Sequence, residues 1–92
     1  MATYVMFGTY SAEALKGMSA KRSGEAKALI ETHGGELKAG YATLGGVDLV
    51  LIVDLPDDAR AMTASVALAK LTGISFTTSP AVTIEAFDRL VA

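Results

Sequence analysis

Few side chains in this sequence can do chemistry, and they are widely spaced along the chain. There is one histidine and no cysteine, so neither a Ser-His-Asp set nor a Cys-His set can be argued, and thiolate metal ligands are excluded. The glycine pairs at 34–35 and 45–46 lack the spacing of a phosphate-binding loop. We therefore predict no catalytic residue, no metal site and no cofactor, and the sequence leaves open whether the protein is an enzyme.

Asp48 is the carboxylate with the most informative position. It follows the glycine pair at 45–46 and precedes the wholly apolar run Leu49 to Val53. An aspartate at such a turn most often accepts hydrogen bonds from backbone N–H groups. The alternative is a carboxylate at the mouth of a cavity, where burial would raise its pKa and make it a candidate base.

Three tyrosines, at positions 4, 10 and 41, fall in stretches that we predict to be strands. An aromatic ring with a polar tip commonly packs at an interface, and the alternative is a ligand pocket in which the hydroxyls donate hydrogen bonds. Both interpretations stay open for these positions. The residues that we predict to line a ligand site are Tyr4, Met6, Arg22, Tyr41 and Asp48.

Arg22 and His33 belong to the first predicted long helix. Arg22 falls near its apolar stripe, seven residues after Leu15. It either extends along the surface with its charge in water, or turns inward to pair with an aspartate (48 or 54) or to bind an anionic ligand. His33 lies where the helix is expected to end, and the helix dipole favours a cation there, so we predict a capping role.

Hydrophobic patterning and turn residues predict the elements that position these groups. Ser11 is predicted to be a helix N-cap. The segment 17–19 is predicted to break the first helix, and the glycine pair 34–35 is predicted to end it. The predicted elements are a strand at 3–10, a helix from 11 to about 33, strands at 36–44 and 48–55, a helix from 56 to about 71, and an extended fourth strand from 74 to about 87, followed by a short helical turn.

The order of these elements is β-α-β-β-α-β in a single domain, residues 1–92. The first and third strands are apolar on both faces and belong in the centre, whereas the second and fourth carry charges, hydroxyls and a proline and belong at the edges. A right-handed crossover leaves room for the third strand beside the first. We therefore predict an α+β, ferredoxin-like fold with an antiparallel sheet in the order 4-1-3-2 and two helices on one face.

The apolar content is high for so small a chain. The sequence has 92 residues, 51% of them hydrophobic, and its mean hydropathy is positive. A domain of this size buries only about 60–65% of the surface of its unfolded chain. The sheet face away from the helices should still carry Met6, one row of the third strand and Tyr41. We predict that a second subunit closes that face as a dimeric α/β barrel or a higher assembly.

Charge and hydropathy exclude several classes of partner. The net charge is −2 with acidic and basic residues scattered along the chain, so no basic stripe predicts nucleic-acid binding. The longest apolar run, at 49–53, is far shorter than the ~20 residues that a membrane span needs. The N-terminus lacks the basic segment of a signal peptide. We expect a cytoplasmic protein that partners with itself and with a small molecule.

Nearly the whole chain resembles the GYD domain family, small bacterial and archaeal proteins of the dimeric α/β-barrel type, and the most specific motif lies in its middle. The residues that carry the resemblance are Tyr41, Thr43-Leu44-Gly45, Gly46-Val47-Asp48, Leu49 to Val53 and Pro56-Asp57. Val47 stands where the family's naming tyrosine would be, so a role of that hydroxyl would be lost here. The resemblance implies the fold and self-association. It also implies that His33 could be a haem ligand, because relatives of this barrel type can hold haem through one histidine.

Three functional hypotheses follow. The leading one is an oligomeric GYD-like domain that binds a small, mostly apolar ligand inside the barrel. The second is a small cofactor-independent monooxygenase-like or isomerase-like enzyme that uses Tyr41, Asp48 and His33. The third is a purely structural oligomerisation module without a ligand.

Overall fold

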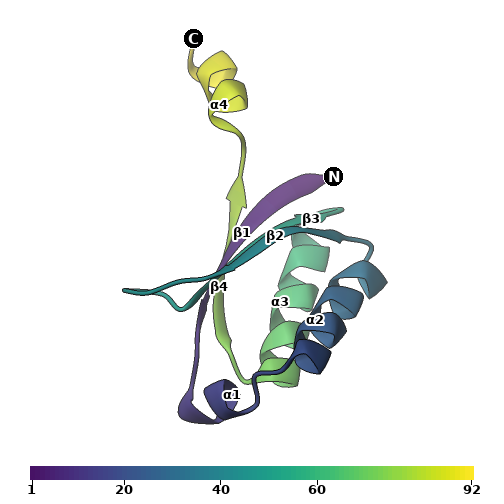
Figure 1. Ribbon diagram of the computed structural model, residues 1–92. Helices are drawn as coiled ribbons and strands as arrows, with labels where there is room; N and C mark the ends of the chain where they lie inside the picture. Colours follow the sequence, from purple (N-terminus) through teal and green to yellow (C-terminus); the bar gives the residue numbers. More distant parts are fainter.

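A four-stranded antiparallel sheet with two long helices on one face forms the body of the protein (Figure 1). The structure, a computed structural model, describes residues 1–92. The strands lie in the order β2-β3-β1-β4, and the predicted α+β class is confirmed. The elements are β1 (Ala2–Thr9), α1 (Ala12–Lys16), α2 (Ala20–Thr32), β2 (Glu36–Ala42), β3 (Leu49–Leu55), α3 (Asp58–Thr72), β4 (Ser75–Ala81) and α4 (Ile84–Val91).

Local capping signals set the ends of the helices. The hydroxyl of Ser11 accepts from Ala14 N–H at the start of α1, and Ser19 caps α2 in the same way after the predicted break. Asp57 caps α3, directly after the proline at 56. A side-chain oxygen at the N-cap satisfies one of the N–H groups that the first turn leaves unpaired. Gly34 follows α2 with a positive φ of 82°, as predicted for the end of that helix.

The two faces of the sheet differ in what covers them. Tyr4 and Met6 of β1 pair with Val53 and Leu51 of β3, and all four side chains are buried beneath α2 and α3. The opposite row has no cover. We call this row the open face; its apolar members are Val5, Phe7, Tyr41, Val50 and Ile52.

The prediction that Met6 lies on the uncovered face is wrong. Its exposed fraction is 0%, and it belongs to the main core cluster together with Tyr4 and Leu68 of α3. Side chains alternate along a strand, and both rows of β1 are apolar. Alternation therefore separates the two rows, but it does not reveal which of them meets the helices.

The C-terminal segment differs most from the prediction. The sequence predicts an extended segment to about Phe87 followed by a short helical turn, but β4 ends at Ala81 and α4 begins at Ile84, with Thr83 as its N-cap. The helical turn is therefore present, but it begins earlier than predicted. No residue of α4 is buried, and the helix stands apart from the body (Figure 1). The run of serine and threonine residues in β4 led to the prediction of a longer strand. A local helix signal follows it, because a threonine cap precedes apolar residues at helical spacing.

None of the helices combines the length and the apolar character that crossing a bilayer requires. The longest, α3, has 15 residues and carries charged side chains in its first and last turns.

Candidate functional site

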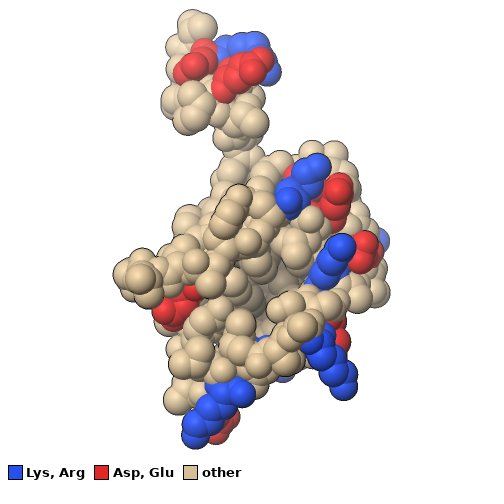
Figure 2. Space-filling view, viewed as in Figure 1, with Lys and Arg blue, Asp and Glu red and all other residues tan.

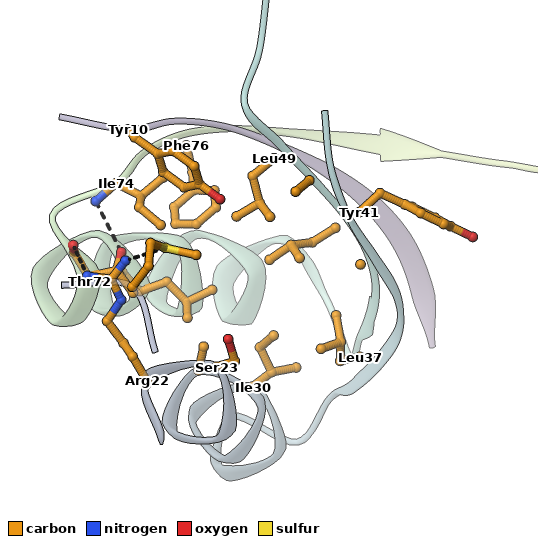
Figure 3. Close-up of a pocket in the computed structure, with 16 residues that line it drawn as sticks. Tyr10, Arg22, Ser23, Ile30, Leu37, Tyr41, Leu49, Thr72, Ile74 and Phe76 are labelled. Carbon is orange, nitrogen blue, oxygen red and sulfur yellow. Dashed lines mark hydrogen bonds between the residues drawn. The ribbon is translucent and has the colours of Figure 1, made fainter. Parts of the chain in front are cut away.

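The largest cavity lies between α2 and the sheet, on the helix side (Figure 3). Its volume is about 420 Å³, and 12 of the 16 residues that line it are hydrophobic. In Figure 2 the surface is hollowed between the sheet and the helices, and uncharged residues form most of the rim. Such walls suit an apolar ligand. They include Ala26, Ile30, Leu37, Leu49, Leu51 and Phe76.

Polar groups gather at one end of this cavity. Arg22, Ser23, Thr72 and Tyr10 lie there, and the first three come from the start of α2 and the end of α3 (Figure 3). Arg22 Nη2 donates to Ala14 O at 2.7 Å, and its Nη1 donates to Thr72 O at 3.4 Å. Helix α1 and the last residue of α3 thereby fix the guanidinium at the cavity.

The residues predicted to bind a ligand do not all meet at one place. Arg22 lines the cavity, but it pairs with neither of the two aspartates, and its guanidinium donates to backbone carbonyl groups instead. Tyr41 also lines the cavity, but its ring points away from it towards the open face, with 61% of its surface exposed (Figure 3). Met6 and Tyr4 lie in the core beneath the helices. Sequence reasoning missed Ser23 and Thr72, because neither falls in a pattern that marks a site.

The side chain of Asp48 accepts a hydrogen bond from a backbone N–H group, which is the first of its two predicted roles. Its carboxylate accepts from Tyr10 N–H at 2.9 Å, and its own N–H donates to Gly8 O at 2.9 Å. Thr43 closes the preceding loop, because its N–H donates to Asp48 O and its hydroxyl to Val47 O. These bonds join the β2–β3 loop to the end of β1.

Replacing Asp48 with alanine should therefore lower the free energy of unfolding. The Tyr10 N–H loses its acceptor, and an unsatisfied, half-buried donor costs about 1–2 kcal/mol. Urea denaturation measures the change. Asp48→Asn keeps an acceptor oxygen and should lose less, whereas equal stability of Asp48→Ala and the native protein would contradict this role.

Tyr4 forms a second buried polar contact, beneath α3. Its hydroxyl donates to Asp58 Oδ1 at 2.5 Å. This hydrogen bond, together with burial and the negative charge of Asp58, raises the pKa of Tyr4 to about 12. The carboxylate thus favours the neutral phenol and ties β1 to the first turn of α3.

The Tyr4 contact predicts a loss of stability at high pH. Because the folded state holds the proton more tightly, the contribution is complete below pH 10 and is lost as the pH rises towards about 12. The free energy of unfolding of the native protein should fall more steeply above pH 10 than that of Tyr4→Phe, which has no proton to lose. Parallel pH profiles of the two proteins would contradict the prediction.

The residues invoked for the enzyme hypothesis lie apart. His33 is the C-cap of α2, and its Nδ1 is 2.8 Å from Leu29 O, which confirms its capping position. His33 and Asp48 line none of the three cavities, whereas Tyr41 lines the largest with its ring turned away. No three His, Cys, Asp or Glu side chains converge where a metal ion could be held. The arrangement therefore does not bring Tyr41, Asp48 and His33 to a common site.

The sequence profile of the GYD domain matches residues 4–91. The chain belongs to the GYD domain family. The expected resemblance is confirmed, and the loop that carries it contains Asp48, which joins this loop to β1. No curated protein matches this GYD domain.

Solved structures share the fold of this GYD domain. One is the leucine response regulatory protein LrpA of Mycobacterium tuberculosis, with a TM-score of 0.60 and 11% identity; the match covers 89% of this chain and 51% of that one. A second is a mutant in which alanine replaces a glutamate, with a TM-score of 0.59 and 13% identity; this match covers 89% of this chain and 50% of that one. This chain thus spans about half the length of the solved chains that it matches, and at these identities the likeness concerns the fold alone.

Proposed function

We propose that this GYD domain binds a small, mostly apolar molecule in the cavity between α2 and the sheet. The observation that carries the proposal is an apolar cavity of about 420 Å³ in a chain that buries only 13 of its 92 residues. Ligand pockets commonly measure about 300–1,000 Å³ and combine apolar walls with a few polar groups. The cavity lies on the helix side of the sheet, not on the open face that a barrel would enclose.

An uncharged apolar dye tests the proposal. Nile red should bind with increased fluorescence, and Ala42→Phe should weaken binding, because Ala42 is an exposed residue that lines the cavity. Ala28→Phe adds the same ring on the exposed side of α2, outside the cavity lining, and should bind like the native protein. Unchanged binding by Ala42→Phe would place the dye elsewhere and contradict the proposal. Native mass spectrometry of the purified protein would reveal a retained ligand.

Self-association is the second part of the proposed function. Val50, Ile52 and Val5 lie half-buried at the centre of the open face, and Phe7 keeps 37% of its surface exposed. A contiguous apolar patch on a small chain favours burial against a partner. A second copy that packs its own open face there would form the predicted barrel.

Helix α4 supports the same assembly. It has eight residues, and Ile84, Phe87, Leu90 and Val91 are all exposed. Isolated helices shorter than about 12–15 residues are marginal in water, so an apolar helix of this length needs a surface to pack against. In the assembly, the partner subunit provides that surface. Sedimentation analysis at micromolar concentration should give a dimer or larger species, and a monomer would contradict this part of the proposal.

A further inference from the structure

Arg22 is a half-buried cation without an anionic partner. The four ion pairs of the structure involve other residues, and Arg22 is the only charged residue that lines the cavity. Taking a charge away from water is costly unless it is paired or hydrogen-bonded. The only charge at this cavity is therefore positive, and no carboxylate of the chain neutralises it.

The contacts of Arg22 hold the guanidinium in place and leave part of it unused. Nη2 donates to Ala14 O and to Met18 Sδ, both at 2.7 Å, and Nη1 donates to Thr72 O. A guanidinium has five N–H donors in a fixed plane, so Nε–H and one Nη1–H stay free of these bonds. A fixed cation with spare donors can receive an anion without first losing side-chain freedom.

Two hydroxyls lie at the same cavity. Those of Tyr10 and Ser23 line it, and no hydrogen bond joins them to the other lining residues drawn in Figure 3. Hydroxyl and guanidinium groups are all donors to an anionic oxygen. One end of the cavity thus offers hydrogen-bond donors and a single positive charge, whereas the walls at Leu37 and Leu51 offer only apolar contact.

From this arrangement we infer that the ligand is an amphipathic monocarboxylate, with its carboxylate on Arg22 and its apolar body along Ile30, Leu37 and Leu51. The inference rests on the binding site proposed above and specifies the ligand class. One guanidinium balances one negative charge, and no second cation lines the cavity to balance a phosphate dianion. Charge-assisted hydrogen bonds to a carboxylate are about twice as strong as neutral ones.

Gly17 gives independent support, because it leaves the space that the guanidinium occupies. A Cβ at this position would lie 2.6 Å from Arg22 Nη1. The φ of Gly17 is −84°, which other residues adopt without strain. Gly17→Ala should therefore displace the end of the Arg22 side chain without removing its charge. This substitution tests whether binding depends on where the guanidinium lies, whereas Arg22→Gln tests whether it depends on the charge itself.

A matched pair of probes tests the inference. Octanoate and octanamide share the same chain, and only octanoate carries a charge at neutral pH. Displacement of bound Nile red measures both affinities. The native protein should bind octanoate at least about tenfold more tightly than octanamide. Hydrogen bonds to a charged group are stronger than neutral ones, and the difference in free energy corresponds to an affinity ratio of about this size.

Three variants complete the experiment. Arg22→Gln and Gly17→Ala should reduce the preference for octanoate to within about twofold, while each still binds Nile red. Lys27→Gln removes one positive charge from an exposed position of α2 that does not line the cavity, so it should keep the preference. If Arg22→Gln fails to fold, Gly17→Ala carries the test alone.

The failures of the two proposals are distinguishable. Equal affinity of the native protein for octanoate and octanamide, with Nile red still bound in the cavity, would overturn the carboxylate inference and leave the apolar site in place. A preference that persists in both Arg22→Gln and Gly17→Ala would also overturn it. The absence of binding of all three probes would overturn the proposed site itself.

Discussion

Replacing Met6 with aspartate should unfold the protein, whereas the same substitution at the neighbouring Phe7 should leave it folded. Met6 has an exposed fraction of 0% and lies in the core between the sheet and the two long helices. A carboxylate there has no cationic partner, and an unpaired buried charge destabilises by more than about 4 kcal/mol. Small domains have only about 5–15 kcal/mol in total. Circular dichroism should show the loss of secondary structure.

Phe7→Asp is the matched control, because residues 6 and 7 are adjacent and point to opposite faces of β1. Phe7 is 37% exposed on the open face, so its replacement by a carboxylate can remain hydrated. This variant should keep its circular dichroism spectrum and sediment as a monomer, because a charge on the open face opposes packing against a second copy. A folded Met6→Asp, or an unfolded Phe7→Asp, would contradict the assignment of the two faces.

The second large effect is expected at Gly35, between α2 and β2. A Cβ at this position would collide with the carbonyl oxygen of Asp54 and lie 2.6 Å from Leu55 Cδ2. Asp54 belongs to β3, which pairs on both of its sides with β1 and β2, so its backbone has little freedom to yield. Overpacking of this kind costs about 3 kcal/mol, and Gly35→Ala should lower the free energy of unfolding by that amount.

Gly24→Ala provides the opposite expectation within the same part of the chain. Gly24 lies inside α2, and a Cβ there would meet nothing within 4 Å. Alanine is favoured over glycine in a helix interior by about 1 kcal/mol, so this substitution should stabilise the protein. Urea denaturation of both variants decides the matter. A Gly35→Ala protein as stable as the native one would mean that β2 and β3 can separate locally at little cost.

The sequence alone predicted the features that depend on neighbouring residues. The cap at Ser11, the break before α2 and the glycine end of α2 are confirmed, because each depends on hydrogen bonds or backbone angles within a few positions. The α+β class follows from the order of the elements. The same local logic would have placed the start of α4 correctly at Ile84, since Thr83 and the apolar residues after it form a helix signal.

Only the tertiary structure decided which groups meet at the site. Both rows of β1 are apolar, so the docking of α2 and α3 determined that Met6 is buried and that Phe7 is exposed. Arg22 reaches the cavity because α1 and the end of α3 present carbonyl groups to it. These partners lie eight and 50 residues away along the chain. No pattern of local spacing encodes such a contact, because it arises only when separate elements pack together.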